Sequence, residues 1–82
     1  MYRVYAIYNK FANKIYIGQT KDLGERIILH NDKVFKGFTS RFPGEWKLIY
    51  KESVATRQEA LKREKQLKSF RGREFIKSHI PE

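Results

Sequence analysis

The chain has 82 residues, two histidines and no cysteine, so it suits one compact domain and offers no thiol for a disulfide or a thiolate metal site. Its 18 Lys and Arg exceed its nine Asp and Glu, and the net charge of +9 indicates a polyanionic partner. No apolar run approaches the roughly 20 residues that cross a bilayer, and no signal-peptide pattern is present. We expect residues 1–82 to form a single cytoplasmic domain with no membrane partner.

The chain begins with two predicted strands joined by a turn. Residues 2–8 and 15–20 are rich in aromatic and β-branched side chains, which favour strands. The polar residues between them, 9–14, supply a loop short enough for a hairpin. We therefore expect the two strands to pair in antiparallel fashion.

The expected hairpin register brings two tyrosines together. If Tyr8 pairs with Asn13, Tyr5 lies directly opposite Tyr16 on one face of the strands. Gly18 shares that face because it lies two residues beyond Tyr16. Since glycine has no side chain, a phosphate could approach the backbone there. Ordinary packing of strand tyrosines is the alternative interpretation.

A helix is predicted over residues 22–32, where Asp22 has the side chain and position of an N-cap. Arg26 and His30 are four residues apart, so they project together from one face of this helix. Glycine and proline punctuate the following residues, 33–45, which are expected to form a loop or a short helix.

The second half of the chain predicts one strand and two helices. Residues 46–54 have strand composition, and residues 56–70 are predicted to form a helix capped by Thr56. Gly72 is expected to stop that helix, and a short helix is expected over residues 72–78. The order strand, strand, helix, strand, helix, helix indicates an α+β fold with a three-stranded, mostly antiparallel sheet.

One carboxylate of the long helix falls among its apolar positions. A helical projection places Glu64 on the face expected to hold Leu61, Leu67 and Phe70. A lone carboxylate turned toward a small core costs free energy unless it is paired or holds a cation. A bound metal ion and an internal salt bridge both remain open as explanations. The arginines considered as salt-bridge partners are Arg26, Arg57 and Arg71.

Short motifs follow one another with definite spacing. Arg3-Val4-Tyr5 is followed by Tyr16-Ile17-Gly18, whose tyrosine lies eleven residues after Tyr5, and Arg26 lies ten residues beyond Tyr16. These elements resemble the paired motifs and the helix arginine of the GIY-YIG nuclease superfamily. The first motif keeps only its tyrosine, whereas the second is complete.

Later elements extend this resemblance from residue 2 to about residue 77. His30-Asn31 matches the His-Asn of the small stand-alone bacterial members, and residues 39–50 resemble their connector and third strand. Residues 60–68 resemble the helix that carries their metal-binding glutamate. The chain is also similar to the N-terminal catalytic domain of the excision-repair nuclease, although Gln19 replaces a lysine of those relatives. Residues 69–82 contain no match to an asparagine that many family nucleases carry.

The resemblance implies a metal-dependent endonuclease that hydrolyses DNA phosphodiester bonds with one Mg²⁺ or Mn²⁺ ion. Glu64 would hold the ion, and Arg26 would bind the scissile phosphate. Tyr16 would act as the base with help from Tyr5, provided that positive charge lowers its pKa. His30 would contact phosphate or shuttle a proton. The supporting positions are Gly18, Gln19 and Asn31.

Two other functions remain open from the sequence. The first is a non-catalytic nucleic-acid-binding module on the same fold, bound through the Lys and Arg cluster of residues 57–77. A cluster of this kind is also typical of a solvated helix face. The second is a protein-interaction adaptor built on the connector residues Phe35, Phe38 and Phe42. We expect DNA as the partner, with RNA left open. Specificity would come from a protein partner or from a DNA structure such as a flap or branch, as in repair or recombination. The expected nucleic-acid contacts are Arg41, Arg57, Arg63, Lys65, Lys68, Arg71 and Arg73.

Overall fold

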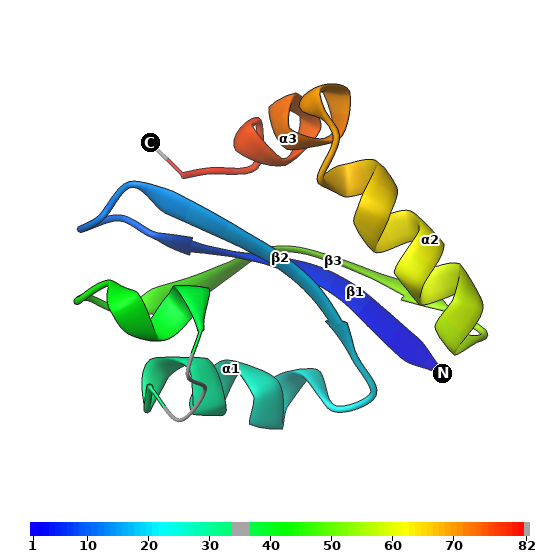
Figure 1. Ribbon diagram of the computed structural model, residues 1–82, viewed down its shortest axis with the longest axis horizontal. Coiled ribbons are helices and arrows are strands. Elements are labelled where there is room, and N and C mark those ends of the chain that lie inside the picture. Colours follow the sequence, from blue (N-terminus) through cyan, green and yellow to red (C-terminus); the bar gives the residue numbers. More distant parts are fainter. Residues whose placement is uncertain (34–36, 82) are drawn as a thin grey trace.

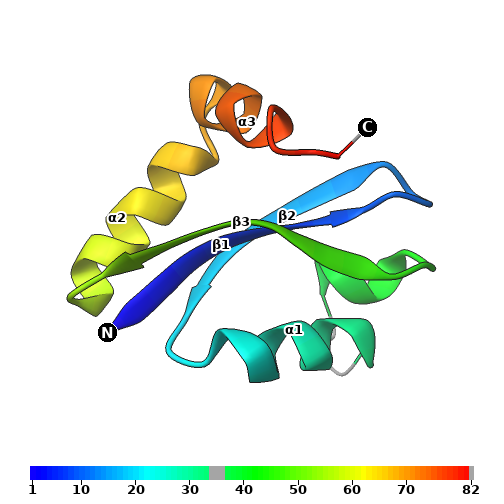
Figure 2. The same ribbon diagram turned by 180° about the vertical axis from the view of Figure 1, so that it is seen from behind.

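The computed structural model describes residues 1–33 and 37–81 and confirms the predicted α+β fold. Helices α1 and α2–α3 lie on opposite faces of one sheet (Figures 1 and 2). The strands are β1 (Tyr2–Asn9), β2 (Lys14–Thr20) and β3 (Trp46–Val54). The helices are α1 (Leu23–Asn31), the 3₁₀ helix η1 (Phe38–Arg41), α2 (Arg57–Leu67) and α3 (Phe70–Lys77).

The sheet has the strand order β2-β1-β3, and both pairings are antiparallel. The central strand β1 is buried on both faces, and its residues Val4 to Ile7 are at most 1% exposed. Strands β2 and β3 are the two edges of the sheet. Both helical layers reach the edge strand β2, because α2 packs against it and His30 of α1 contacts Tyr16.

The first hydrophobic core lies between the sheet and the α2–α3 layer. Val4 and Ala6 of β1 point into it because alternate residues of a strand share a face. They pack with Ala60 and Leu67 of α2 and with Ile76 of α3, all of which are buried. This burial fixes α2 against the sheet and sets which of its residues face inward.

The second core lies on the opposite face, beneath α1. Tyr5 and Ile7 of β1 pack there with Trp46, the first residue of β3. Leu23 and Ile27, spaced by four residues on α1, cover this cluster as their helical spacing predicts. Tyr5 is therefore part of a packed core as well as a candidate site residue.

The hairpin register differs from the expected one by two residues. Tyr5 pairs with Gly18 and Tyr16 pairs with Ile7, so the two tyrosines are diagonal neighbours rather than direct partners. The pairing extends to Asn9 and Lys14, so the four loop residues are 10–13 rather than 9–12. A shift of two residues preserves the face, so both tyrosines still lie beneath α1.

The helical half of the chain breaks earlier than predicted. Helix α2 ends at Leu67, and the side chain of Ser69 caps α3 by accepting a hydrogen bond from the Gly72 backbone N–H (3.2 Å). Gly72 therefore lies in the first turn of α3 rather than stopping α2. A Cβ at this position would overlap the Gln66 carbonyl oxygen and the Leu67 backbone, so the close approach of the two helices requires glycine.

Two residues assigned to the apolar face of the long helix lie outside the core. Phe70 starts α3 and is 79% exposed, because the chain changes direction at Ser69. Leu61 is also exposed. The inward face of α2 instead consists of Ala60, Glu64 and Leu67, which follow the i, i+4, i+7 spacing of one helical stripe.

The connector after α1 contains the 3₁₀ helix η1, in agreement with the expected loop or short helix. Phe38 packs edge-on against Phe42 with ring centroids 5.0 Å apart, and it also approaches Trp46 at 6.3 Å. The third aromatic residue proposed for a docking surface, Phe35, lies outside the described residues. Across residues 1–33 and 37–81, none of the helices has the length and hydrophobicity that a membrane span requires.

Candidate active site

Three buried side chains form a hydrogen-bonded chain beneath α1. The hydroxyl of Tyr5 lies 2.8 Å from Nε2 of His30, and Nδ1 of His30 lies 2.9 Å from the hydroxyl oxygen of Thr39. Tyr5 is 1%, His30 3% and Thr39 2% exposed. Because His30 shares one helical stripe with Ile27, the packing of α1 on the sheet carries this imidazole inward.

Tyr16 completes an aromatic cluster around His30. Its ring centroid lies 4.9 Å from that of His30 and 6.3 Å from that of Tyr5. Tyr16 is partly exposed, whereas Tyr5 is fully buried. Of the two tyrosines, Tyr16 is therefore the one that solvent or a ligand can reach.

Gly18 does not leave an open floor beside this cluster. A Cβ there would lie 2.9 Å from both the Tyr5 hydroxyl oxygen and a ring carbon of Tyr16. The two tyrosine rings already occupy the space that glycine leaves. Gly18 thus permits the tyrosines to lie against the strand backbone, which corrects the expectation of a direct approach by phosphate.

Charged groups from both faces of the sheet act on the tyrosines. Burial raises the pKa of Tyr16, and the negative charge of Glu64 raises it further, while Arg26 opposes both effects. Burial is also the largest cause of the raised pKa of Tyr5, and Tyr16, Arg26 and Glu64 act on it in addition. The condition set for Tyr16 as a base, a pKa lowered by positive charge, is thus opposed by burial and by Glu64 and favoured only by Arg26.

His30 is neutral at physiological pH. Burial lowers its pKa from 6.5 to about 4, and the positive charges of Arg26 and Lys33 act in the same direction. A neutral imidazole has one N–H donor and one acceptor nitrogen. His30 can therefore accept one hydrogen bond and donate another, but it does not carry a charge that would hold a phosphate.

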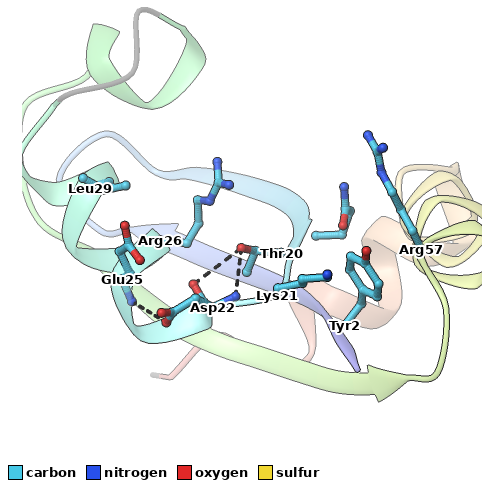
Figure 3. Close-up of a pocket in the computed structure, with 9 residues that line it drawn as sticks. Tyr2, Thr20, Lys21, Asp22, Glu25, Arg26, Leu29 and Arg57 are labelled. Carbon is cyan, nitrogen blue, oxygen red and sulfur yellow. Dashed lines mark hydrogen bonds between the residues drawn. The ribbon is translucent and has the colours of Figure 1, made fainter.

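Arg26 lies at a cleft of about 410 Å³ at the end of β2, here called the Arg26 cleft. Figure 3 shows Arg26 of α1 and Arg57 of α2 extending toward the same side of this cleft. Gln19 and Lys21, from the end of β2 and the turn after it, line it as well. The Arg26 cleft thus combines basic groups from opposite faces of the sheet, and the carboxylates of Asp22 and Glu25 also line it.

Glu64 lies on the inward stripe of α2, as predicted, with 22% of its side chain exposed. Its carboxylate pairs with Lys68 one helical turn away at 3.5 Å, rather than with Arg26, Arg57 or Arg71. A partly exposed i, i+4 pair of this kind contributes only about 0.3–0.5 kcal/mol. Lys68 therefore competes only weakly with a metal cation for this carboxylate.

A second hollow, of about 860 Å³, runs along the first half of β2 and is here called the Tyr16 groove. Tyr16 and Phe38 line it from one face of the sheet, with their rings stacked at 6.3 Å. Ile80 lines it near the end of the chain, and none of its described lining residues is acidic. The basic residues that line it are Lys14, Lys68, Arg73 and Lys77.

Some of the expected nucleic-acid contacts line a hollow and others do not. Lys68 and Arg73 line the Tyr16 groove, and Arg57 lines the Arg26 cleft. Arg63 instead donates to the Glu52 carboxylate at 2.8 Å, toward β3 and away from both hollows. The residues that are exposed but line neither hollow are Arg41, Lys65 and Arg71.

Several residues of the site were not singled out from the sequence. Lys14 could have been found, since it lies two residues before Tyr16 and therefore shares its face. Lys21 and Lys77 could not have been found, because the chain has many lysines and arginines and no spacing singles out these two. Thr39 could not have been found, because its contact with His30 depends on the path of the connector.

Asn31 has a structural position beside the site. Its side-chain amide donates to the backbone carbonyl of Trp46 (3.0 Å), and its carbonyl oxygen accepts from the backbone N–H of Trp46. This pair of bonds joins the end of α1 to the start of β3. Asn31 therefore holds the connector in place and does not reach the aromatic cluster through any contact among the described residues.

Comparison with known proteins agrees with this fold and geometry. A sequence model described as the GIY-YIG catalytic domain matches residues 1–75. A UPF0213 protein from Staphylococcus epidermidis is 38% identical over 64 residues, which cover 77% of this chain and 76% of the relative. A UPF0213 protein from Staphylococcus saprophyticus is 39% identical over the same shares of the two chains. No solved structure matches at a comparable level of significance.

The fold and the matching domain define a protein of the nuclease superfamily, for which nucleic acid is the indicated substrate. Within that superfamily, the chain belongs to the GIY-YIG family. Family nucleases generally use divalent metal ions. A nucleic-acid substrate also agrees with the net charge of +9.

Proposed function

We propose that this protein is a divalent-metal-dependent endonuclease that hydrolyses phosphodiester bonds in DNA. The observation that carries the proposal is the convergence of Tyr5, Tyr16 and His30, all within ring or hydrogen-bond contact. Arg26 and Glu64 act electrostatically on both tyrosines from opposite faces of the sheet. A positive group, a carboxylate and proton-transfer groups at one place are what phosphodiester hydrolysis requires.

The donor set at Glu64 fits a hard divalent cation with an open coordination sphere. No group of three or more His, Asp or Glu side chains that could enclose a metal occurs in residues 1–33 and 37–81. Mg²⁺ is usually bound through one or two carboxylates and keeps several waters or substrate oxygens, so a single partly exposed carboxylate suffices. When bound there, the ion would supply positive charge beside the scissile phosphate.

Arg26 is assigned to the scissile phosphate. A guanidinium presents a planar fork of N–H donors that matches two non-bridging phosphate oxygens. Arg26 lines an open cleft and its charge acts on Tyr5, Tyr16 and His30. Negative charge that develops on the phosphate during attack would therefore be stabilised beside the proton-transfer groups.

Tyr16 is assigned as the group that orients and deprotonates the attacking water. It is reachable from the Tyr16 groove, whereas Tyr5 is sealed in the core. The Glu64 carboxylate is one of the charges that oppose its deprotonation, so neutralising that carboxylate lowers the pKa of Tyr16. Tyr5 and His30 would then hold the Tyr16 ring in place through their ring contacts with it.

The DNA backbone is assigned a path along the outer side of β2. The Arg26 cleft lies at one end of this strand and the Tyr16 groove follows its first half. Both hollows carry lysine and arginine, and such contacts to phosphate position a nucleic acid without reading its sequence. This path would lead the scissile phosphate past Tyr16 and Arg26.

A binding module without catalysis is the second candidate. Gln19 lines the Arg26 cleft, and the repair nucleases that the chain resembles carry a lysine there, so one positive charge of that cleft is missing. The raised pKa of Tyr16 also favours this candidate, because a tyrosine that keeps its proton is a poor base. This candidate predicts DNA binding with no metal-dependent cleavage.

A cleavage assay with a Glu64→Gln variant separates these two functions. Single-stranded, duplex, flap and branched DNA would be incubated with Mg²⁺, Mn²⁺ or a chelator. We expect metal-dependent product from the wild type and a loss of roughly 100-fold or more in rate for the variant, the scale of removing one electrostatic stabiliser. Binding to the same DNA should change little.

Glu59→Gln is the matched control, because Glu59 is an exposed carboxylate on the same helix. It removes the same charge and should cleave like the wild type. Cleavage that persists in Glu64→Gln or in excess chelator would contradict the metal-dependent mechanism. Binding without product from the wild type on every substrate would favour the binding module.

A further inference from the structure

Thr39 is a buried polar residue to which the proposed chemistry assigns no role. It lies in η1, is 2% exposed, and its hydroxyl oxygen is 2.9 Å from Nδ1 of His30. The other ring nitrogen of His30, Nε2, faces the Tyr5 hydroxyl at 2.8 Å. Thr39 and Tyr5 thus bond to opposite sides of one imidazole.

The direction of these two bonds follows from the chemistry of the groups. Tyr5 is buried and burial raises its pKa, so it keeps its proton and is a donor. A neutral imidazole has only one nitrogen that accepts, and a phenol O–H is a better donor than the phenol oxygen is an acceptor. Nε2 of His30 therefore accepts from Tyr5, and Nδ1 must carry the hydrogen. The Thr39 oxygen then accepts the Nδ1–H.

We propose that Thr39 is a positioning residue that holds His30 in the Nδ1–H tautomer, with the Nε2 lone pair directed at the Tyr5 hydroxyl. In metal and catalytic sites, the hydrogen bond on one imidazole nitrogen commonly decides which nitrogen is available for chemistry. Without an acceptor at Nδ1, the Nε2–H tautomer becomes available to His30. Its N–H would then face the Tyr5 O–H, and one of the two would have to turn away.

Thr39 is itself held in a fixed place by the surrounding structure. Its backbone carbonyl accepts a hydrogen bond from the indole N–H of Trp46 at 3.2 Å, and Trp46 is fully buried. Asn31, one residue after His30, bonds to both backbone groups of Trp46. The same indole-bearing residue therefore fixes the positions of Thr39 and of the last turn of α1, which keeps the Oγ1 to Nδ1 contact short.

The consequence for the site concerns the orientation of Tyr5. With its proton directed at His30, the Tyr5 oxygen presents its lone pairs to the remaining side of the cluster, where Tyr16 lies. Tyr5 can then accept a hydrogen bond from Tyr16 or from water while it donates its own to His30. The role of this Tyr5 orientation in cleavage rests on the proposed nuclease function, whereas the tautomer of His30 does not.

The tautomer can be measured without any cleavage. Two-bond ¹H–¹⁵N correlation spectra of the ¹⁵N-labelled full chain at neutral pH distinguish protonated from unprotonated imidazole nitrogens. His79→Gln leaves His30 as the only histidine, so no assignment is required. We expect a protonated Nδ1 and an unprotonated Nε2. An Nε2–H tautomer in this protein would overturn the proposal.

Thr39→Val removes the hydroxyl acceptor while keeping the shape of the side chain, and Thr39→Ser restores the hydroxyl. In the His79→Gln background, we expect Thr39→Val to give the Nε2–H tautomer or a mixture, and Thr39→Ser to retain Nδ1–H. If cleavage is present, its rate constant should fall about 10- to 100-fold in Thr39→Val, the scale seen for outer-shell partners of histidine, and recover in Thr39→Ser. DNA affinity should stay the same in both variants.

The outcomes separate this inference from the proposed function. A folded Thr39→Val protein that keeps the pure Nδ1–H tautomer would overturn the role of Thr39, whatever the protein does to DNA. An Nδ1–H tautomer that is lost in Thr39→Val would support it even if no variant cleaves DNA. If Thr39→Val fails to fold, the tautomers of the His79→Gln protein and of its Thr39→Ser variant still decide the question.

Discussion

At the scale of single residues, burial has more influence on the candidate site than any one neighbouring charge. It is the largest cause of the raised pKa of Tyr5 and Tyr16 and of the lowered pKa of His30. All three groups are consequently neutral at physiological pH. Their hydrogen bonds can then be exchanged without moving a full charge through the core, which would be costly.

The positions of Arg26 and His30 on one helical face could be predicted because the spacing of four residues is a local property. The inward position of Glu64 followed from the same periodicity on α2. The ion pair of Glu64 with Lys68 and the bond from His30 to Thr39 could not be predicted in this way. Side-chain choice among several nearby cations, and the path of a connector, depend on the complete fold.

The pKa of His30 predicts a loss of stability in mild acid. Because this pKa is lowered to about 4 from 6.5, protonation favours the unfolded chain. The contribution of neutral His30 is complete above pH 6.5 and is lost progressively as the pH falls from 6.5 to about 4. The loss amounts to about 3 kcal/mol at most.

Urea unfolding of the wild type and of His30→Gln at pH 6.5 and pH 4 would measure this loss. The free energy of unfolding of the wild type should fall more steeply with acid than that of the variant, in which other titrating groups are unchanged. Equal losses in the two proteins would show that His30 is not buried in its neutral form.

At the scale of elements, the alternating faces of β1 and the capping residues Asp22 and Thr56 allowed most of the correct predictions of strands and helix starts. Both caps accept the expected hydrogen bonds, from the backbone N–H of Glu25 and of Glu59. The break between α2 and α3 was misplaced, because Ser69 starts a new helix two residues after α2 ends. That break brings α3 back over the sheet toward β2.

The return of α3 predicts where DNA gains affinity. Arg73 and Lys77 of α3 line the Tyr16 groove beside β2. Replacing both with glutamine should weaken DNA binding evenly across sequences and should reduce the slope of log affinity against log salt by about 2, one unit per phosphate contact. Fluorescence anisotropy of labelled DNA over a salt series would measure this slope.

A double variant of Lys47 and Lys51 to glutamine is the control, because it removes the same charge from the opposite edge strand, β3. Both of these lysines are exposed. If this pair reduces the slope as much as the groove pair does, DNA binds by overall charge and not along β2.

At the scale of the whole molecule, the three-stranded sheet brings residues together that neither helical layer could combine alone. The α1 layer supplies Arg26 and the α2–α3 layer supplies Glu64, and the charges of both act on Tyr5 and Tyr16. His30 of α1 contacts the same two tyrosines. The two helical layers lie on opposite faces of the sheet (Figures 1 and 2). The antiparallel sheet order was predictable from strand patterns only in outline. The position of β2 at an edge, which opens the site, came from the complete topology.

The most direct test of this account is to locate the binding site of Mn²⁺ by paramagnetic broadening of backbone amide signals in ¹H–¹⁵N spectra. We predict that broadening centres on Glu64 and includes Tyr16 to Gly18 of β2, because α2 packs against that strand. It should disappear in Glu64→Gln and persist in Glu59→Gln. Broadening centred on another carboxylate, or unchanged in Glu64→Gln, would contradict a metal site shared between α2 and the tyrosine cluster.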